Sequence, residues 1–317
     1  MQTQNKVLLT LLLLPSLIAE LLSGSSPPLE FLNPLSFLFW GLLYGCGTLL
    51  IREARVRWNM QWSVIFLVIA YGIIEEGLTT KALFNINWVD VAVYSNYGTI
   101  AGVLVPWSIM LLTFHAVIST LIPILIIDLT WPKYKKVSVI GKKGLGLVFL
   151  GLSLIVFFGL KFMGTIINNQ MIPYYPNLIL LFGSLFLVLF LIFLGYKFRN
   201  SQFVSTNNIF KPKIFAIFSF FFMILFMNVP YELAKNNVNQ FGLIFYQLFL
   251  VLILLIFTFY QIYNKNITND HFISIVFGSL FFWCIFAILL EFQGFLGMSI
   301  IGVLAFFILI KWKRNIV

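Results

Sequence analysis

The sequence carries little charge. Lysine, arginine, aspartate and glutamate make up 9% of its 317 residues, against about 25% in a typical soluble domain, and hydrophobic residues make up 61%. Such a chain cannot cover its surface with polar side chains, so lipid must solvate most of it. These proportions exclude a soluble enzyme, a nucleic-acid-binding protein and a disordered protein.

Cysteine and histidine are also scarce. The two cysteines, Cys46 and Cys284, lie inside apolar runs, where we expect buried thiols rather than a disulfide. The sequence contains no Cys-x-x-Cys pair and no mixed cysteine–histidine cluster, which argues against a structural zinc site.

Long apolar runs are what the sequence has in abundance. A membrane-spanning helix needs about 20 predominantly apolar residues. Ten segments meet or approach this length: 6–22, 35–51, 61–83, 101–128, 145–163, 177–196, 213–229, 241–263, 272–290 and 295–311. The sequence therefore predicts an all-α, polytopic bundle of about ten transmembrane helices, surrounded by the lipid bilayer of the cell membrane.

The basic residues predict the orientation of this bundle. With a cytoplasmic N-terminus, 17 of the 20 lysines and arginines fall on the inner side, and only Lys81, Lys161 and Lys235 fall on or towards the outer side. Cytoplasmic connections of membrane proteins are enriched in basic residues. We therefore expect both termini in the cytoplasm, as an even number of helices requires.

The two parts of the chain differ in composition. Only six of the 37 phenylalanines precede residue 145, whereas six of the eight tryptophans do. Most polar groups at membrane depth also precede residue 145. We interpret 1–144 (helices 1–4) as the half that bears a polar site and 145–317 (helices 5–10) as a phenylalanine-rich scaffold, within one membrane domain.

Three ionisable side chains are predicted at one depth in the membrane. The helical rise of about 1.5 Å per residue places Glu75 and Glu76 roughly 21–23 Å above the inner face, and His115 roughly 20 Å above it. Charged groups at such depth are costly, and they normally face the interior of a bundle. We therefore predict Glu75, Glu76 and His115 as candidate catalytic residues that lie close together.

Other polar residues admit plainer interpretations. Glu20 reaches a similar depth, but it is interpreted as a helix end. Lys81 is expected at the outer boundary, where its amine can extend into water. Lys161 is a candidate partner for one of the glutamates in a purely structural ion pair, and His271 is interpreted as a solvated helix cap.

The stretch Ile73-Ile74-Glu75-Glu76-Gly77-Leu78-Thr79-Thr80-Lys81 resembles the first signature of the CPBP family of intramembrane peptidases, which is a Glu-Glu pair followed four residues later by arginine. His115 would match the histidine of a following helix. Lys81 departs from the signature, because it is a lysine five residues after Glu76. The resemblance implies that a carboxylate and an imidazole activate water for amide cleavage.

Three functions therefore stay open. The first is an intramembrane peptidase that uses Glu75, Glu76 and His115 on a membrane peptide. The second is a carrier in which the same carboxylates bind a proton or another small cation. The third is a non-catalytic scaffold whose partners dock on the basic inner connections, especially 133–143.

Overall fold

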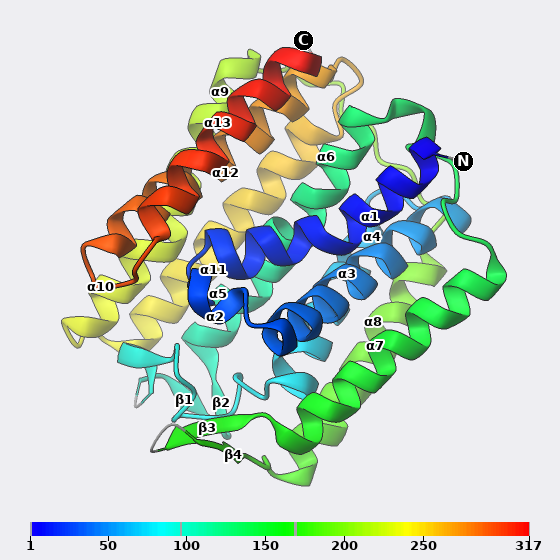
Figure 1. Cartoon of the computed structure of the whole chain (residues 1–317). Helices are drawn as coiled ribbons and strands as arrows, with labels where there is room; N and C mark the ends of the chain where they lie inside the picture. Colours follow the sequence, from blue (N-terminus) through cyan, green and yellow to red (C-terminus); the bar gives the residue numbers. More distant parts are fainter. Residues whose placement is uncertain (1, 96, 168–169, 317) are drawn as a thin grey trace.

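A computed structural model describes residues 2–95, 97–167 and 170–316. The chain is a bundle of long helices with two short β-hairpins (Figure 1). In this part of the chain, eight helices are long and apolar enough to cross a membrane: Gln2–Leu22, Pro34–Arg57, Val105–Thr130, Lys142–Phe162, Leu178–Lys197, Pro212–Lys235, Gln240–Ile262 and Asn269–Glu291. Two further helical stretches, α4 (Val64–Ile73) with its extension η2 (Ile74–Thr79) and α13 (Met298–Ile316), correspond to the other two predicted segments. The predicted all-α membrane bundle is confirmed.

Several of the long helices contain a π-helical turn, in which the backbone hydrogen bonds span one extra residue. The first helix is α1 (Gln2–Ser16) followed by η1 (Leu17–Leu22), and the fourth is α5 (Val105–Phe114), η4 (His115–Leu121) and α6 (Ile122–Thr130). The helix Pro212–Lys235 consists of α9 (Pro212–Met223), η6 (Ile224–Asn228) and α10 (Val229–Lys235), and the helix Gln240–Ile262 consists of α11 (Gln240–Phe257) and η7 (Thr258–Ile262). The remaining long helices are α3 (Pro34–Arg57), α7 (Lys142–Phe162), α8 (Leu178–Lys197) and α12 (Asn269–Glu291).

The short elements gather at one end of the bundle. The hairpins β1–β2 (Thr99–Ile100 and Val103–Leu104) and β3–β4 (Gly164–Ile167 and Gln170–Pro173) are antiparallel and lie opposite the two chain ends (Figure 1). Both termini lie at the other end, as an even number of crossings requires. The positive-inside pattern assigns that end to the cytoplasm.

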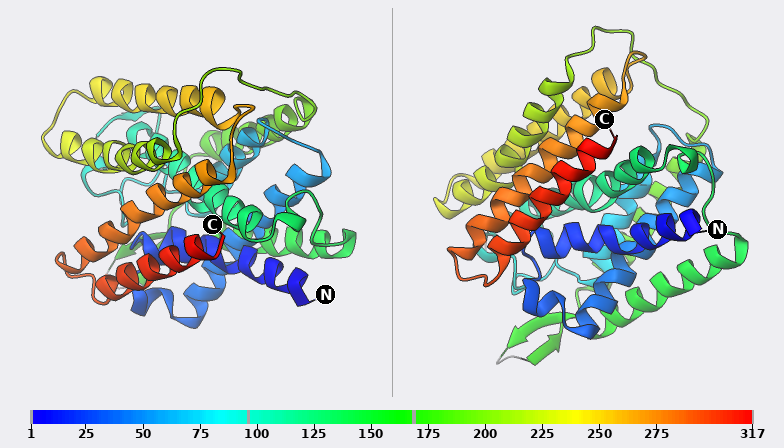
Figure 2. Two further views of the ribbon diagram at one scale, coloured as in Figure 1. Left: turned by 90° about the horizontal axis from the view of Figure 1, so that it is seen from above. Right: turned by 45° about the horizontal axis from the view of Figure 1, so that its top comes forward.

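The helices pack as two groups around a shared centre. Helices α7 and α8 lie along α3 and α4, whereas α9, α12 and α13 form the opposite side of the bundle (Figure 2). The largest hydrophobic core joins the two parts of the sequence, because Tyr44 and Phe114 pack in the same cluster as Phe222 and Trp283. The most buried of the eight helices therefore come from both parts of the sequence, since they are Val105–Thr130 and Asn269–Glu291, whereas Lys142–Phe162, Leu178–Lys197 and Gln240–Ile262 are largely exposed.

Candidate functional site

Three π-helical turns deliver the acidic and histidine side chains to the middle of the bundle. Glu20 lies in η1, Glu75 and Glu76 lie in η2, and His115 is the first residue of η4. A π-helical turn widens the helix and redirects the side chains that follow it, and such turns are frequent at functional sites.

A proline just after η4 explains one of its backbone contacts. Pro123 has no backbone N–H, so it cannot donate to the carbonyl of Ser119, four residues earlier. The Thr48 hydroxyl of α3 donates to that carbonyl instead, at 3.4 Å. Pro123 thus leaves a carbonyl free to bind the neighbouring helix. Pro106 does not do this, because it lies in the first turn of α5, where no helical hydrogen bond is lost.

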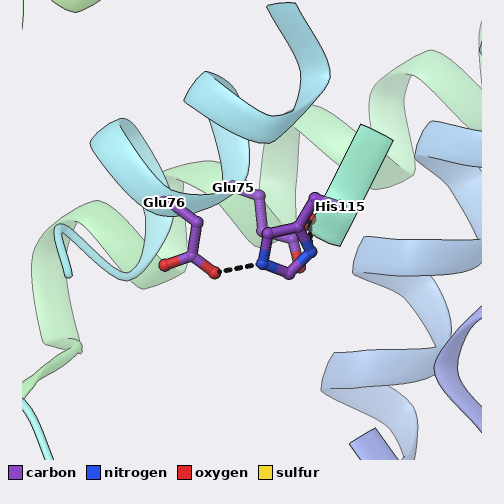
Figure 3. A group of neighbouring side chains, drawn as sticks. All are labelled: Glu75, Glu76 and His115. Carbon is purple, nitrogen blue, oxygen red and sulfur yellow. Dashed lines mark ion pairs between the residues drawn. The ribbon is translucent and has the colours of Figure 1, made fainter. Parts of the chain in front are cut away.

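Glu75, Glu76 and His115 meet at one point (Figure 3). His115 Nε2 lies 2.8 Å from Glu76 Oε1, and His115 Nδ1 lies 3.2 Å from Glu75 Oε2. All three residues are buried. The imidazole therefore lies between two carboxylates in a low-dielectric environment, where charges interact far more strongly than in water.

Two hydroxyl side chains outside the triad contact Glu76 and His115. Thr80 donates to Glu76 Oε2 at 2.9 Å, and the Ser119 hydroxyl lies 3.2 Å from His115 Nδ1. Glu75 is different, because neither of its oxygens accepts a hydrogen bond from a described residue, and its side chain is fully buried. His115 Nε2 likewise has no aligned hydrogen bond among the described residues, although Glu76 is near. Buried polar atoms in this state are rare in proteins, and they point to a missing partner.

Close helix packing brings the triad together. Gly72, one turn before Glu76, faces the junction of α5 and η4: a Cβ atom at this position would lie 3.1 Å from a methyl group of Leu112 and 3.6 Å from the Cβ of His115. On the other side of His115, the rings of Tyr44 and His115 stack at a centroid distance of 5.9 Å. The imidazole is thus fixed between α4 and α3.

Glu20 belongs to the same buried region: it lies near the end of its helix, as interpreted, but its side chain is buried. Its carboxylate accepts hydrogen bonds from the Tyr44 hydroxyl and from the Ser26 hydroxyl, both at 2.6 Å. The matching depth estimate was the signal for Glu20. Tyr44 was missed, because a tyrosine in an apolar run carries no signal that separates it from core packing.

Lys81 does not extend into water as expected. Its side chain is fully buried, and its amine donates to the carbonyls of Gly159, Leu160 and Met163 at 3.0, 2.9 and 2.6 Å. These carbonyls lie at the C-terminal end of α7, where the helix dipole places partial negative charge, and the Gly159 carbonyl also accepts a hydrogen bond from the Met163 N–H at 2.9 Å. Lys81 therefore caps α7.

The remaining basic candidates lie away from the triad. Lys161 is exposed at the end of α7, with its amine 5.6 Å from the ring centroid of Phe162, and it does not pair with Glu75 or Glu76. His271 does cap a helix, since it forms a capping box with Thr268 at the start of α12. It is buried rather than solvated, and its Nε2 lies 2.9 Å from the Phe210 carbonyl oxygen.

The donor set of the triad matches that of a metal centre. Glu75, Glu76 and His115 each offer one ligand atom, and these atoms lie within 4.8 Å of one another. Two carboxylates and one imidazole suit first-row divalent ions such as Zn²⁺ or Mn²⁺.

The chain belongs to an uncharacterized membrane protein family, whose model matches residues 8–313. No curated protein matches the chain, and no solved structure matches it. The family match overturns the resemblance to the CPBP family, since nearly the whole chain is assigned elsewhere. That resemblance depended on three polar residues in two helices. Ionisable groups inside a membrane usually face the interior of the bundle and pair with one another, so such a pattern is not specific to one family.

Proposed function

We propose that Glu75, Glu76 and His115 form an acid–base centre that activates water for hydrolysis inside the cell membrane, with an amide bond of a membrane peptide as the substrate. The single observation that carries this proposal is the position of His115, whose two ring nitrogens lie 2.8 and 3.2 Å from two different buried carboxylates. These are hydrogen-bonding distances at which protons pass between such groups.

Glu75 is the better candidate for the base. Its oxygens accept no hydrogen bond from a described residue, whereas Glu76 is held by Thr80 and lies close to His115. Glu75 would take a proton from water as the water oxygen attacks the peptide carbonyl. The proton would then pass through His115 to the amine as the carbon–nitrogen bond breaks, which leaves an acid and an amine and restores the centre.

The competing structural explanation has lost its proposed partner, because Lys161 does not reach the acids. The group that lies beside both carboxylates is instead His115. Ionisable groups buried at membrane depth are costly, and they are usually retained for function.

One observation favours a second candidate, a carrier for protons or another small cation. Glu20 adds a third buried carboxylate, and its neighbours continue towards the outer side, where Ser25 lies 3.5 Å from the exposed carboxylate of Asp90. A series of acidic and hydroxyl groups from the surface to the triad is suited to ion entry.

The test compares Glu75→Gln, Glu76→Gln and His115→Gln with the unchanged protein, each purified in detergent. Glu232→Gln in α10 is the matched control, because Glu232 is exposed. For a hydrolase, Glu75→Gln should reduce cleavage of a membrane-peptide library by about 10²–10⁴-fold with a nearly unchanged melting temperature. Glu232→Gln should retain full activity.

The same variants, reconstituted in vesicles, test the carrier. Ion-driven uptake by the unchanged protein that Glu75→Gln abolishes, without any peptide cleavage, would replace the hydrolase by the carrier. A lower melting temperature with neither activity in the unchanged protein would instead support a structural triad.

A further inference from the structure

We infer that the triad is a binding site for one first-row divalent metal ion, held by Glu75, Glu76 and His115 Nε2. This inference rests on the proposed function and changes one of its steps. The ion would polarise the attacking water, and because Nε2 is then a ligand, Glu75 rather than His115 would pass the proton to the amine. Its test measures binding, so the metal site and the hydrolase can fail separately.

The unpaired atoms of the triad carry the inference. Both oxygens of Glu75 and the Nε2 nitrogen of His115 are buried without an aligned hydrogen bond from the described residues. Each of these atoms has a lone pair available for a cation when the imidazole is protonated on Nδ1. Acidic residues grouped at random on a surface would be solvated, whereas Glu75 is fully buried.

The outer contacts have the arrangement that metal ligands need. A ligating histidine usually forms a hydrogen bond through its other nitrogen, which fixes the ring. Here Ser119 Oγ and Glu75 Oε2 both lie 3.2 Å from Nδ1, so Nε2 remains for the ion and the second oxygen of Glu75 is the one that would reach it. Thr80 donates to Glu76 Oε2 and leaves Oε1, the oxygen 2.8 Å from Nε2, to face the same point.

The ligand spacing requires two adjustments. Ligands about 2.1 Å from a tetrahedral ion are about 3.4 Å apart, so Glu76 Oε1 and His115 Nε2, which are 2.8 Å apart, would separate by roughly 0.6 Å when the ion binds. The three ligand atoms lie within 4.8 Å of one another, so a rotation of the Glu75 side chain towards Nε2 would have to close up to about 1.4 Å. Three protein ligands then leave a fourth position for water, and Glu75 Oε2 stays available as the base.

Charge balance favours a divalent ion. Two carboxylates and a neutral imidazole carry two negative charges at a depth where an uncompensated charge is costly. An ion with two positive charges neutralises them. A single sodium ion would leave one negative charge buried.

The test is metal binding to the full-length protein in detergent, after removal of metal with EDTA. We expect one Zn²⁺ or Mn²⁺ per chain by calorimetry, a higher melting temperature with the ion, and no comparable effect of Mg²⁺. Glu75→Gln and His115→Gln should abolish binding, and Glu232→Gln should leave it unchanged. A Cys46→Ser/Cys284→Ser variant should also bind normally, which excludes zinc capture by the two thiols.

Two outer-contact variants keep the test decisive if a ligand variant fails to fold. Thr80→Val and Ser119→Ala leave all three ligands in place, and each should weaken binding by about 10–100-fold. No stoichiometric binding to the unchanged protein, or equal binding to Glu75→Gln, would overturn the inference. Peptide cleavage that persists after EDTA treatment would overturn the metal site and support the hydrolase, whereas stoichiometric binding without cleavage would do the reverse.

Discussion

The amine of Lys81 lies 2.6 Å from the carbonyl oxygen of Met163, although 82 positions separate the two residues in the chain. Glu75 and Glu76 lie in η2, and this contact connects the residues directly after η2 to the end of α7. Lys81 has a left-handed backbone conformation, with φ of 62°, which turns the chain sharply out of the helix. A residue that looked like a surface anchor thus holds the acid-bearing helix in position.

Replacing Lys81 by methionine should destabilise the protein. The change removes the buried amine that donates to three carbonyls at the end of α7, although the N–H groups of Met163 and Tyr174 still donate to two of them. We expect a loss of about 1–3 kcal/mol in the free energy of unfolding. The measurement is thermal unfolding in detergent, followed by a thiol-reactive dye that labels the buried cysteines Cys46 and Cys284 as they become exposed. Lys161→Met is the matched control and should change stability by less than about 0.5 kcal/mol, because Lys161 is exposed.

Gly159→Ala should separate α7 from η2. A Cβ atom at residue 159 would lie 2.3 Å from Thr79 Cγ2 and 2.9 Å from the Thr79 carbonyl oxygen, so one helix must move. We expect a loss of about 1–3 kcal/mol in thermal unfolding. Adding Thr79→Ser, which removes the Cγ2 methyl group, should restore part of the stability. Gly183→Ala, at a glycine with open space around it, should have little effect, and an equal loss there would contradict this explanation.

Tyr44→Phe should release Glu20 from one of its two hydrogen bonds while the aromatic ring stays in place. Removing one partner of a buried hydrogen bond costs about 1–3 kcal/mol, so the melting temperature should fall accordingly. Tyr260→Phe is the control, because Tyr260 is exposed. An unchanged melting temperature for Tyr44→Phe would show that Glu20 does not depend on this contact.

The orientation of the bundle can be tested by fusion of a reporter that is active only outside the cell. It should be active after residues 90, 170 and 237, and inactive after residues 55, 140 and 205, since 17 of the 20 basic residues then face the cytoplasm. Reporter activity at 140, inside the most basic connection, would reverse the assignment. Glu75, Glu76 and His115 would then lie nearer the inner face.

The sequence by itself determined the membrane class and the helical segments, and it predicted a shared depth for Glu75, Glu76 and His115. Each of these depends on hydrophobic length and helical rise, which are local quantities that a single sequence states directly.

Only the tertiary structure decided which polar groups face one another. Contacts such as Tyr44 with Glu20 or Lys81 with Gly159 depend on how each helix is rotated about its axis. One extra residue in a π-helical turn rotates the side chains that follow it by about 100° about the helix axis, and no sequence pattern predicts the turn. The depth of a side chain can therefore be calculated from its position along its own helix. Its partner depends on packing between helices that are distant in the sequence.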